Sequence, residues 1–177
     1  MLKLYRHDPD GVRYWEAWDA GDTVVAHWGG LGEAGDSQEV RIEPGETAET
    51  VIARESRAPR ADGYHEIPVE DHSTVIVQYK TQGWGSPEDL QKRHRVEGIL
   101  NESLGWTGNG HCDGGDIGSG TINVYALVVD PYLAKNAIVA ALKEDGLLEG
   151  ALIAYRAPDD EYVILWPEDF QGEFSIF

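Results

Sequence analysis

Cysteine is almost missing from this chain of 177 residues, because Cys112 is the only one. A single cysteine cannot form an internal disulfide, and no cationic start with an apolar run precedes the first predicted strand. The sequence therefore predicts a protein of the reducing cytoplasm. Long apolar runs are missing as well, since the longest fall far short of the roughly 18 residues that suggest a membrane span. We expect no membrane segment.

Basic residues are scarce. The chain has 14 Lys and Arg against 32 Asp and Glu, for a formal net charge of −18, and both halves share this acidity. A negative surface opposes binding to phosphates, so nucleic acid and anionic lipid are poor candidates as partners. Two interpretations remain: the acidic side chains form solvated faces, or they meet a basic partner such as the cleft of a nuclease.

Several catalytic signatures are absent. The chain has no HExxH, no GxSxG, no Walker loop and no zinc-deaminase pairing of histidine with cysteines. The sequence therefore favours a non-enzymatic protein that needs no cofactor and no metal.

The first part of the chain predicts an antiparallel meander followed by one helix. Turn residues such as Asp8-Pro9-Asp10-Gly11 separate the apolar runs. The predicted strands are Leu2–His7, Val12–Asp19, Asp22–Trp28 and Ser37–Ile42, and the predicted helix is Glu46–Arg57. Pro59, Gly63 and Pro68 mark Ala58–Val69 as a linker, which gives two domains, 1–67 and 68–177.

The second part alternates strands with helices. Ser86-Pro87-Glu88-Asp89 is a strong helix start, and so is Asp130-Pro131. The predicted elements are the strands Thr74–Lys80, Thr121–Val129, Gly150–Arg156 and Tyr162–Trp166, a helix from Ser86 to about Leu104, a glycine-rich hairpin, and a helix from Asp130 to Gly146. The order β-α-β-β-α-β over residues 73–157 is that of a ferredoxin-like split βαβ unit. The fold class is therefore α+β.

The run Trp28-Gly29-Gly30 ends an aromatic strand, and the turn Gly32-Glu33-Ala34-Gly35 follows it. Together with Lys3-Leu4-Tyr5 and Gly63-Tyr64, it resembles the WGR domain over residues 1–67. In that family the domain helps DNA-break-sensing poly(ADP-ribose) polymerases to engage DNA and relay activation, and it also occurs in small bacterial proteins. The resemblance implies a binding role.

Gly30 stands where the WGR family has its signature arginine. The change removes a planar donor fork suited to phosphates and carboxylates, so we do not expect DNA to be the partner. The alternative interpretation is that Trp28 packs into the sheet and the glycines only turn the chain.

A second candidate site is the glycine-rich hairpin of residues 105–120. On a regular strand His111 and Asp113 share one face and Cys112 points to the other. His111, Asp113 and Asp116 could bind a ligand, but the set has too few donors for a typical metal site. Exposed backbone N–H groups that bind an anion, or a plain bulged hairpin, are the alternatives. The hairpin is similar to one in bacterial ferredoxin-like proteins, some from toxin-immunity loci.

These observations favour a non-enzymatic interaction protein, an acidic immunity or inhibitor factor that masks a basic partner surface. The alternative is a ligand-binding, metal-binding or catalytic domain centred on the hairpin. Trp28, Gly29, Gly30 and Trp84 are the predicted partner-binding residues, because a tryptophan beside glycine is not shielded by neighbouring side chains. We expect Trp28 or Trp84 to be substantially exposed.

Overall fold

The computed structural model describes residues 1–176, which form two compact units. Unit 1 comprises Met1–Pro68 together with Trp106–Gly108, and unit 2 comprises Val69–Gly105 and the chain from Asn109 onward. Each unit has its own antiparallel sheet, with four strands in unit 1 and five in unit 2, and each also contains helices. The expected α+β class is confirmed.

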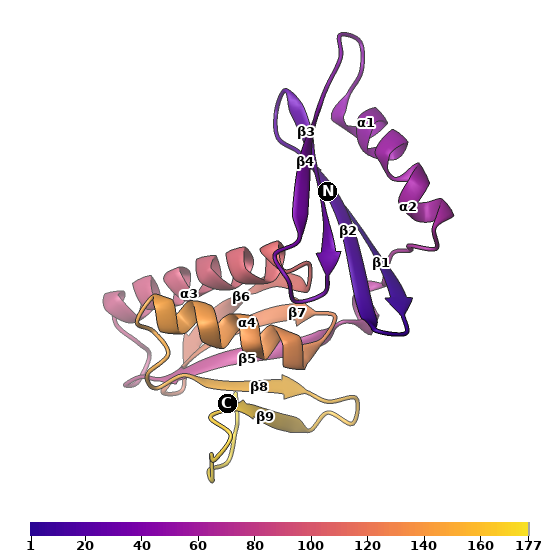
Figure 1. The fold of residues 1–177 in the computed structure, drawn as a ribbon. Coiled ribbons are helices and arrows are strands. Elements are labelled where there is room, and N and C mark those ends of the chain that lie inside the picture. Colours follow the sequence, from indigo (N-terminus) through magenta and orange to yellow (C-terminus); the bar gives the residue numbers. More distant parts are fainter. Residues whose placement is uncertain (177) are drawn as a thin grey trace. The chain divides into compact units, whose positions relative to one another are not determined.

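The sheet of unit 1 is a meander in which each strand pairs with the next, in the order β1-β2-β3-β4 (Figure 1). Gly11 follows the first turn as the first residue of β2, and Gly21 lies in the turn after β2; their positive φ angles of 139° and 92° favour glycine. The strands are β1 (Leu2–Asp8), β2 (Gly11–Asp19), β3 (Thr23–Gly30) and β4 (Asp36–Arg41).

Helix α1 (Ala48–Glu55) covers one face of this sheet. Thr47 caps its first turn, because Thr47 and Thr50 each accept a hydrogen bond from the backbone N–H of the other. Ala48 and Val51 pack against the buried side chains of the sheet, among which are Leu4, Trp15, Ala17, Val24 and Ala26.

The predicted linker is partly wrong, because it contains a second helix, α2 (Arg57–Ala61). Pro59 suggested an irregular segment, but it is the third residue of this helix. A proline in the first helical turn removes an N–H that has no intrahelical acceptor there, so the helix tolerates it.

The sheet of unit 2 has the strand order β6-β7-β5-β8-β9. Strands β5 and β7 pair from Ser73 with Val128 to Lys80 with Thr121, which confirms the prediction that these two segments share one sheet. After the 3-10 turn Val69–Asp71, the elements are β5 (Ser73–Lys80), α3 (Pro87–Trp106), β6 (Gly110–Gly118), β7 (Thr121–Val128), α4 (Pro131–Glu144), β8 (Leu152–Arg156) and β9 (Tyr162–Trp166).

Both long helices lie on the same face of this sheet (Figure 1). Their buried residues recur every four positions: Val96, Leu100 and Leu104 in α3, and Ala134, Ile138 and Leu142 in α4. This spacing gives each helix one apolar stripe. The stripes pack on alternate residues of the strands, among them Val75, Val77, Tyr79, Ile122 and Val124. Among residues 1–176, no helix has both the length and the apolarity to cross a membrane.

Candidate functional site

Trp84 is the most exposed large apolar side chain of residues 1–176, with 85% of its surface accessible. It lies between β5 and α3 and is flanked by Gly83 and Gly85, whose φ angles are +60° and +85°. The predicted exposure of a tryptophan beside glycine is therefore confirmed for this residue.

Backbone hydrogen bonds hold the loop that carries Trp84. The N–H of Thr81 donates to the carbonyl of Gly120 over 2.9 Å, and the N–H of Gly120 donates to the carbonyl of Gly83 over 3.0 Å. A Cβ atom at Gly85 would lie 2.5 Å from Cγ2 of Ile117. Glycine at this position therefore lets the loop lie directly on the β6–β7 hairpin.

The start of α3 fixes the other end of the loop. Asp89 Oδ2 accepts hydrogen bonds from the Thr81 hydroxyl over 2.6 Å and from the Ser86 N–H over 2.8 Å. These bonds, that of Thr81 first, lower the pKa of Asp89, so its carboxylate is charged at neutral pH. One side of the Trp84 ring lies near Gly118, where a Cβ atom would be 3.7 Å from the indole. The indole is thus presented to solvent from an ordered support.

Trp28 differs from Trp84 in exposure and belongs to the other unit. It is 36% exposed and lies opposite Trp15 in the β2–β3 register, so the two side chains share one face of the sheet. A Cβ atom at Gly29 would lie 2.8 Å from Cα of Gly35, and one at Gly30 would lie 2.9 Å from the Glu33 carboxylate. Gly29 therefore serves close packing in the loop after β3.

A buried polar network lies on the opposite face of this sheet, and the sequence did not indicate it. His27 is 1% exposed and Glu16 is 4% exposed. Nδ1 of His27 is 2.8 Å from Glu16 Oε1, and its Nε2 is 2.6 Å from the carbonyl of Ala34. The Glu16 carboxylate also pairs with Nζ of Lys3 over 2.9 Å.

Tyr14 completes this network. Its hydroxyl lies 3.0 Å from Nε2 of His27 and donates to the carbonyl of Glu33 over 3.1 Å. Burial and then the Glu16 carboxylate raise the pKa of Tyr14, so the phenol stays protonated. The rings of Trp18 and Trp106 meet His27 edge-on at 6.1 Å and 5.2 Å between centroids. Because His27 is enclosed and bonded to a backbone carbonyl, the network shapes the loop after β3 and offers no reactive nitrogen to a substrate.

The glycine-rich hairpin does not gather its three candidate side chains into a metal site. His111 and Asp113 are exposed on β6, and the register shifts between Cys112 and Gly114, so Asp113 is the extra residue of a β-bulge. The simple alternation assumed for this strand therefore does not hold. Within residues 1–176, no group of three or more His, Cys, Asp or Glu side chains is placed to hold a metal ion.

Asp116 is held by neighbouring side chains. Its Oδ1 accepts from Nδ2 of Asn123 over 2.8 Å, and its Oδ2 accepts from the hydroxyl of Tyr125 over 2.6 Å. Asn123 in turn accepts from Nε2 of Gln78 over 2.8 Å. Both carboxylate oxygens of Asp116 are thus engaged in a polar row that crosses β6, β7 and β5.

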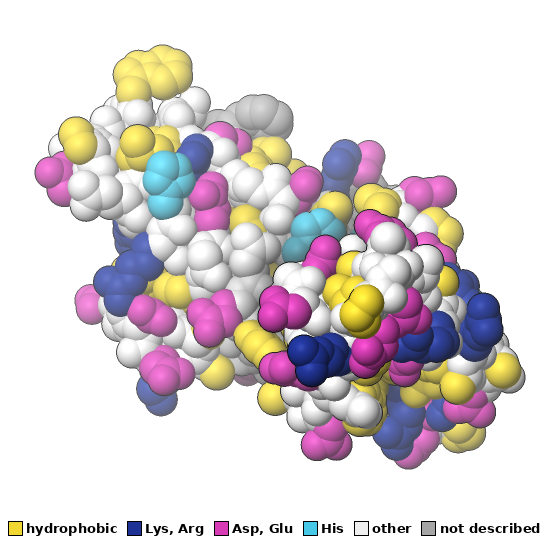
Figure 2. Space-filling view, turned by 90° about the horizontal axis from the view of Figure 1, so that it is seen from above, with side chains coloured by type: hydrophobic (Ala, Val, Ile, Leu, Met, Phe, Trp, Pro, Cys, Tyr) yellow, Lys and Arg dark blue, Asp and Glu magenta, His cyan; other side chains and the backbone are white. Residues whose placement is uncertain are grey.

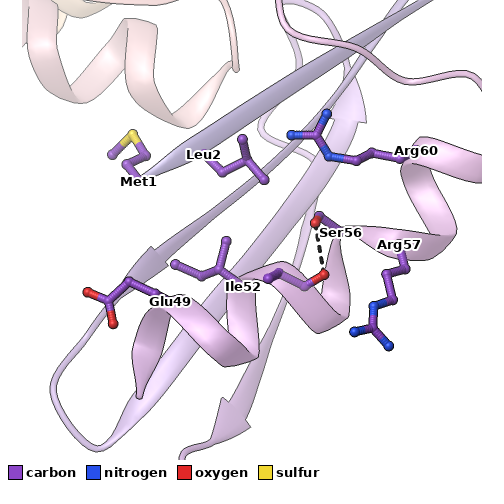
Figure 3. A pocket seen from close by; sticks show the side chains of 8 residues that line it. Met1, Leu2, Glu49, Ile52, Ser56, Arg57 and Arg60 are labelled. Atoms are coloured by element: carbon purple, nitrogen blue, oxygen red, sulfur yellow. Dashed lines mark hydrogen bonds between the residues drawn. The ribbon is translucent and has the colours of Figure 1, made fainter. Parts of the chain in front are cut away.

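A groove of about 440 Å³ lies in unit 1 between the start of β1 and the helices α1 and α2 (Figure 3). Met1, Leu2 and Ile52 provide apolar surface, and Arg57 and Arg60 stand at the α2 end. The sequence did not indicate this groove, because the linker expected at residues 58–69 leaves no second helix to line it. The available signal was the spacing of four from Ile52 to Ser56 to Arg60, which places these residues on one side of a continuing helical run.

Acidic side chains are distributed over the face seen in Figure 2, where they are interspersed with Lys and Arg. This view is consistent with the excess of 32 acidic over 14 basic residues. No family model matches the chain, and the comparisons with curated proteins and with solved structures gave no match.

Proposed function

We propose that the chain is a non-enzymatic protein-interaction module and that Trp84 is its main anchor. The observation that carries this proposal is an indole that is 85% exposed on a loop held at both ends. A few tryptophan, tyrosine and arginine side chains supply most of the affinity in protein interfaces. Because the loop is already ordered, binding loses little conformational entropy.

The partner that fits this surface carries arginine on a basic face. A guanidinium group can stack on an exposed indole and gain a cation–π interaction, and the net charge of −18 attracts basic proteins over longer distances. This chemistry supports the proposal that the chain acts in the cytoplasm as an immunity or inhibitor factor that masks a basic surface, such as the cleft of a nuclease.

The proposed fold families are a WGR-like domain over residues 1–67 and a ferredoxin-like domain over residues 68–177. The meander of unit 1 with α1 supports the first. In unit 2, α3 connects β5 to β6 with β7 between them, and α4 connects β7 to β8 with β5 between them. Two such split βαβ connections support the second.

The alternative, a ligand-binding or catalytic domain centred on residues 105–120, has weaker support. Asp116 has both oxygens engaged by Asn123 and Tyr125. A ligand at this carboxylate would have to replace two short hydrogen bonds within the protein.

The proposed function can be tested by titrating a labelled arginine-rich peptide with the full chain and measuring the fluorescence anisotropy of the peptide. Trp84→Ala should weaken binding at least tenfold, which corresponds to about 1.4 kcal/mol. Tyr132→Ala is the matched control, because Tyr132 is a 55% exposed aromatic residue of the same unit. It should bind the peptide as the unmodified chain does.

Equal affinity of Trp84→Ala and the unmodified chain would contradict the proposed anchor. A lysine-rich peptide of equal charge separates stacking from general attraction. It should bind more weakly than the arginine-rich peptide and should lose less affinity on Trp84→Ala, because an ammonium group is attracted to the indole but cannot stack on it as a planar guanidinium does.

A further inference from the structure

We propose that the groove between β1 and the helices α1 and α2 binds a small amphiphile with a carboxylate head and a hydrocarbon tail, of the fatty-acid type. The proposed site lies wholly in unit 1, so it is independent of the role assigned to Trp84. Its volume of about 440 Å³ falls within the usual range of small-molecule sites.

The middle of the groove suits a hydrocarbon tail. Leu2 and Ile52 are partly buried side chains at the edge of the unit 1 core, and they leave apolar surface open to the groove. Figure 3 shows Met1 and Leu2 on one side and Ile52 on the other. Covering this surface with methylene groups removes apolar area from water.

The polar side chain on the floor, that of Ser56, has its one O–H donor engaged within the chain. The hydroxyl of Ser56 donates to the carbonyl of Ala53 over 3.2 Å, drawn as the dashed line in Figure 3. The carbonyl groups of a peptide turned toward this hydroxyl would lose water without gaining a donor. A hydrocarbon tail has no such groups, which favours a fatty carboxylate over a peptide.

The α2 end of the groove suits the carboxylate head. Arg60 reaches over the groove toward Leu2, and Arg57 stands at the rim with its guanidinium pointing outward (Figure 3). Within residues 1–176, Arg57 has no ion-pair partner, and Arg60 pairs over 2.8 Å with Glu66, an exposed residue. An exposed ion pair contributes little, so a carboxylate can replace Glu66 and accept from the guanidinium fork.

The opposite end of the groove carries charges of both signs. Glu49 lies there, in the first turn of α1, well separated from Arg57 and Arg60 in Figure 3. Hydrogen bonds from its own backbone N–H and from Thr47 lower the pKa of Glu49, so it is negative at neutral pH. The Met1 ammonium group also acts on Glu49 and offsets its charge, so the carboxylate head is directed by its attraction to the arginine end.

Decanoate, kept below the concentration at which it forms micelles, is the probe for this site. Titration of the full chain, followed by NMR of its methyl groups, should shift the signals of Leu2 and Ile52. Decanol, which has the tail without the charge, should bind at least tenfold more weakly. The double substitution of Arg57 and Arg60 by alanine should reduce decanoate binding to the level of decanol.

Arg41→Ala is the matched control, since Arg41 is an exposed arginine of β4 that does not line the groove. It should leave decanoate binding unchanged. Equal binding of decanoate by the double variant and the unmodified chain would overturn the proposal, and so would shifts that avoid Leu2 and Ile52.

A short apolar peptide with a free C-terminal carboxylate is the last comparison. If the peptide binds here and decanoate does not, the fatty-carboxylate assignment is wrong.

Discussion

Gly35 determines how the loop after β3 returns to the sheet. It has a φ angle of +61°, and a Cβ atom at this position would collide with the carbonyl oxygen of Trp28 and the hydroxyl of Tyr14. The same hydroxyl bonds the carbonyl of Glu33. The loop therefore depends on close approach of its backbone to Tyr14, which only glycine allows.

Gly35→Ala should lower the free energy of unfolding of unit 1 by about 3 kcal/mol, because strain from the left-handed conformation adds to steric overlap. Gly45→Ala is the control. Gly45 also has a positive φ, +94°, but a Cβ atom there would have nothing within 4 Å. Gly45→Ala should lower the free energy of unfolding by only about 1 kcal/mol. Urea unfolding followed at the β3 amides by NMR measures both, and equal losses would show that the close approach is unimportant.

Cys112 is expected to react slowly with alkylating reagents. Burial is the largest effect that raises the pKa of this thiol, and the carboxylates of Glu97 and Asp113 add to it, while the Gly114 N–H and Arg93 oppose it. A raised pKa leaves less thiolate at any given pH below it, and the thiolate is the nucleophile.

The rate of alkylation of Cys112 by iodoacetamide should therefore rise at higher pH than the rate for an exposed cysteine. Ser37→Cys in a Cys112→Ser background provides that comparison, because Ser37 is exposed on the edge strand β4. The pH at half-maximal rate separates the pKa effect from restricted access, which lowers the rate at every pH. Coincident pH profiles would refute the expectation.

Single residues were predictable from the sequence where their neighbours in the chain determine their environment. Gly83 and Gly85 made the exposure of Trp84 predictable. The contact of Glu16 with His27 was not, because it depends on the β2–β3 register that places these residues opposite each other. The engagement of Asp116 likewise depends on Asn123 across the β6–β7 pair.

Among the features of whole elements, the capping residues best predict where a helix begins. Asp130 Oδ1 accepts from the N–H groups of Tyr132 and Leu133 over 2.8 Å and 2.9 Å, and Pro131 follows as the first residue of α4. These local signals allowed both the start of α4 and the start of α3 to be predicted.

Asp130→Ala should lower the free energy of unfolding of unit 2 by about 1 kcal/mol, since two N–H groups of the first turn lose their acceptor. Asp130→Asn should stay within a few tenths of a kcal/mol of the unmodified chain, because asparagine is an equally good cap. Urea unfolding followed at α4 measures both. If Asn and Ala were equally damaging, the carboxylate charge rather than the hydrogen bonds would be the stabilising feature.

The sequence did not predict two features, one for a local reason and one because its partner lies far away in the chain. Helix α2 was missed because Pro59 usually ends a helix and here lies in a first turn. The segment Trp106–Gly108 lies far along the chain, yet it packs in unit 1, where the Tyr5 hydroxyl donates to the Gly108 carbonyl over 3.1 Å. No local pattern around Trp106 indicates that partner.

For the whole molecule, charge is the property that discriminates best among partners. The 32 acidic residues exceed the 14 basic ones throughout the sequence. Unit 1 contains cations in its groove, but Arg60 is paired with Glu66, and elsewhere Arg6 and Arg13 are paired with Asp8. A duplex of DNA would therefore meet few free cations against many carboxylates.

We expect no binding to duplex DNA with sub-micromolar affinity at about 150 mM salt, measured by fluorescence anisotropy with a labelled duplex. Proteins that bind DNA through phosphates release counterions, so their affinity rises steeply as salt is lowered. With a net charge of −18, this chain gains no favourable free energy from counterion release. Reduced screening at low salt instead strengthens the repulsion between its carboxylates and the DNA phosphates. Lowering the salt should therefore fail to produce binding. Affinity that increases at low salt would reveal a phosphate-binding surface and contradict the prediction.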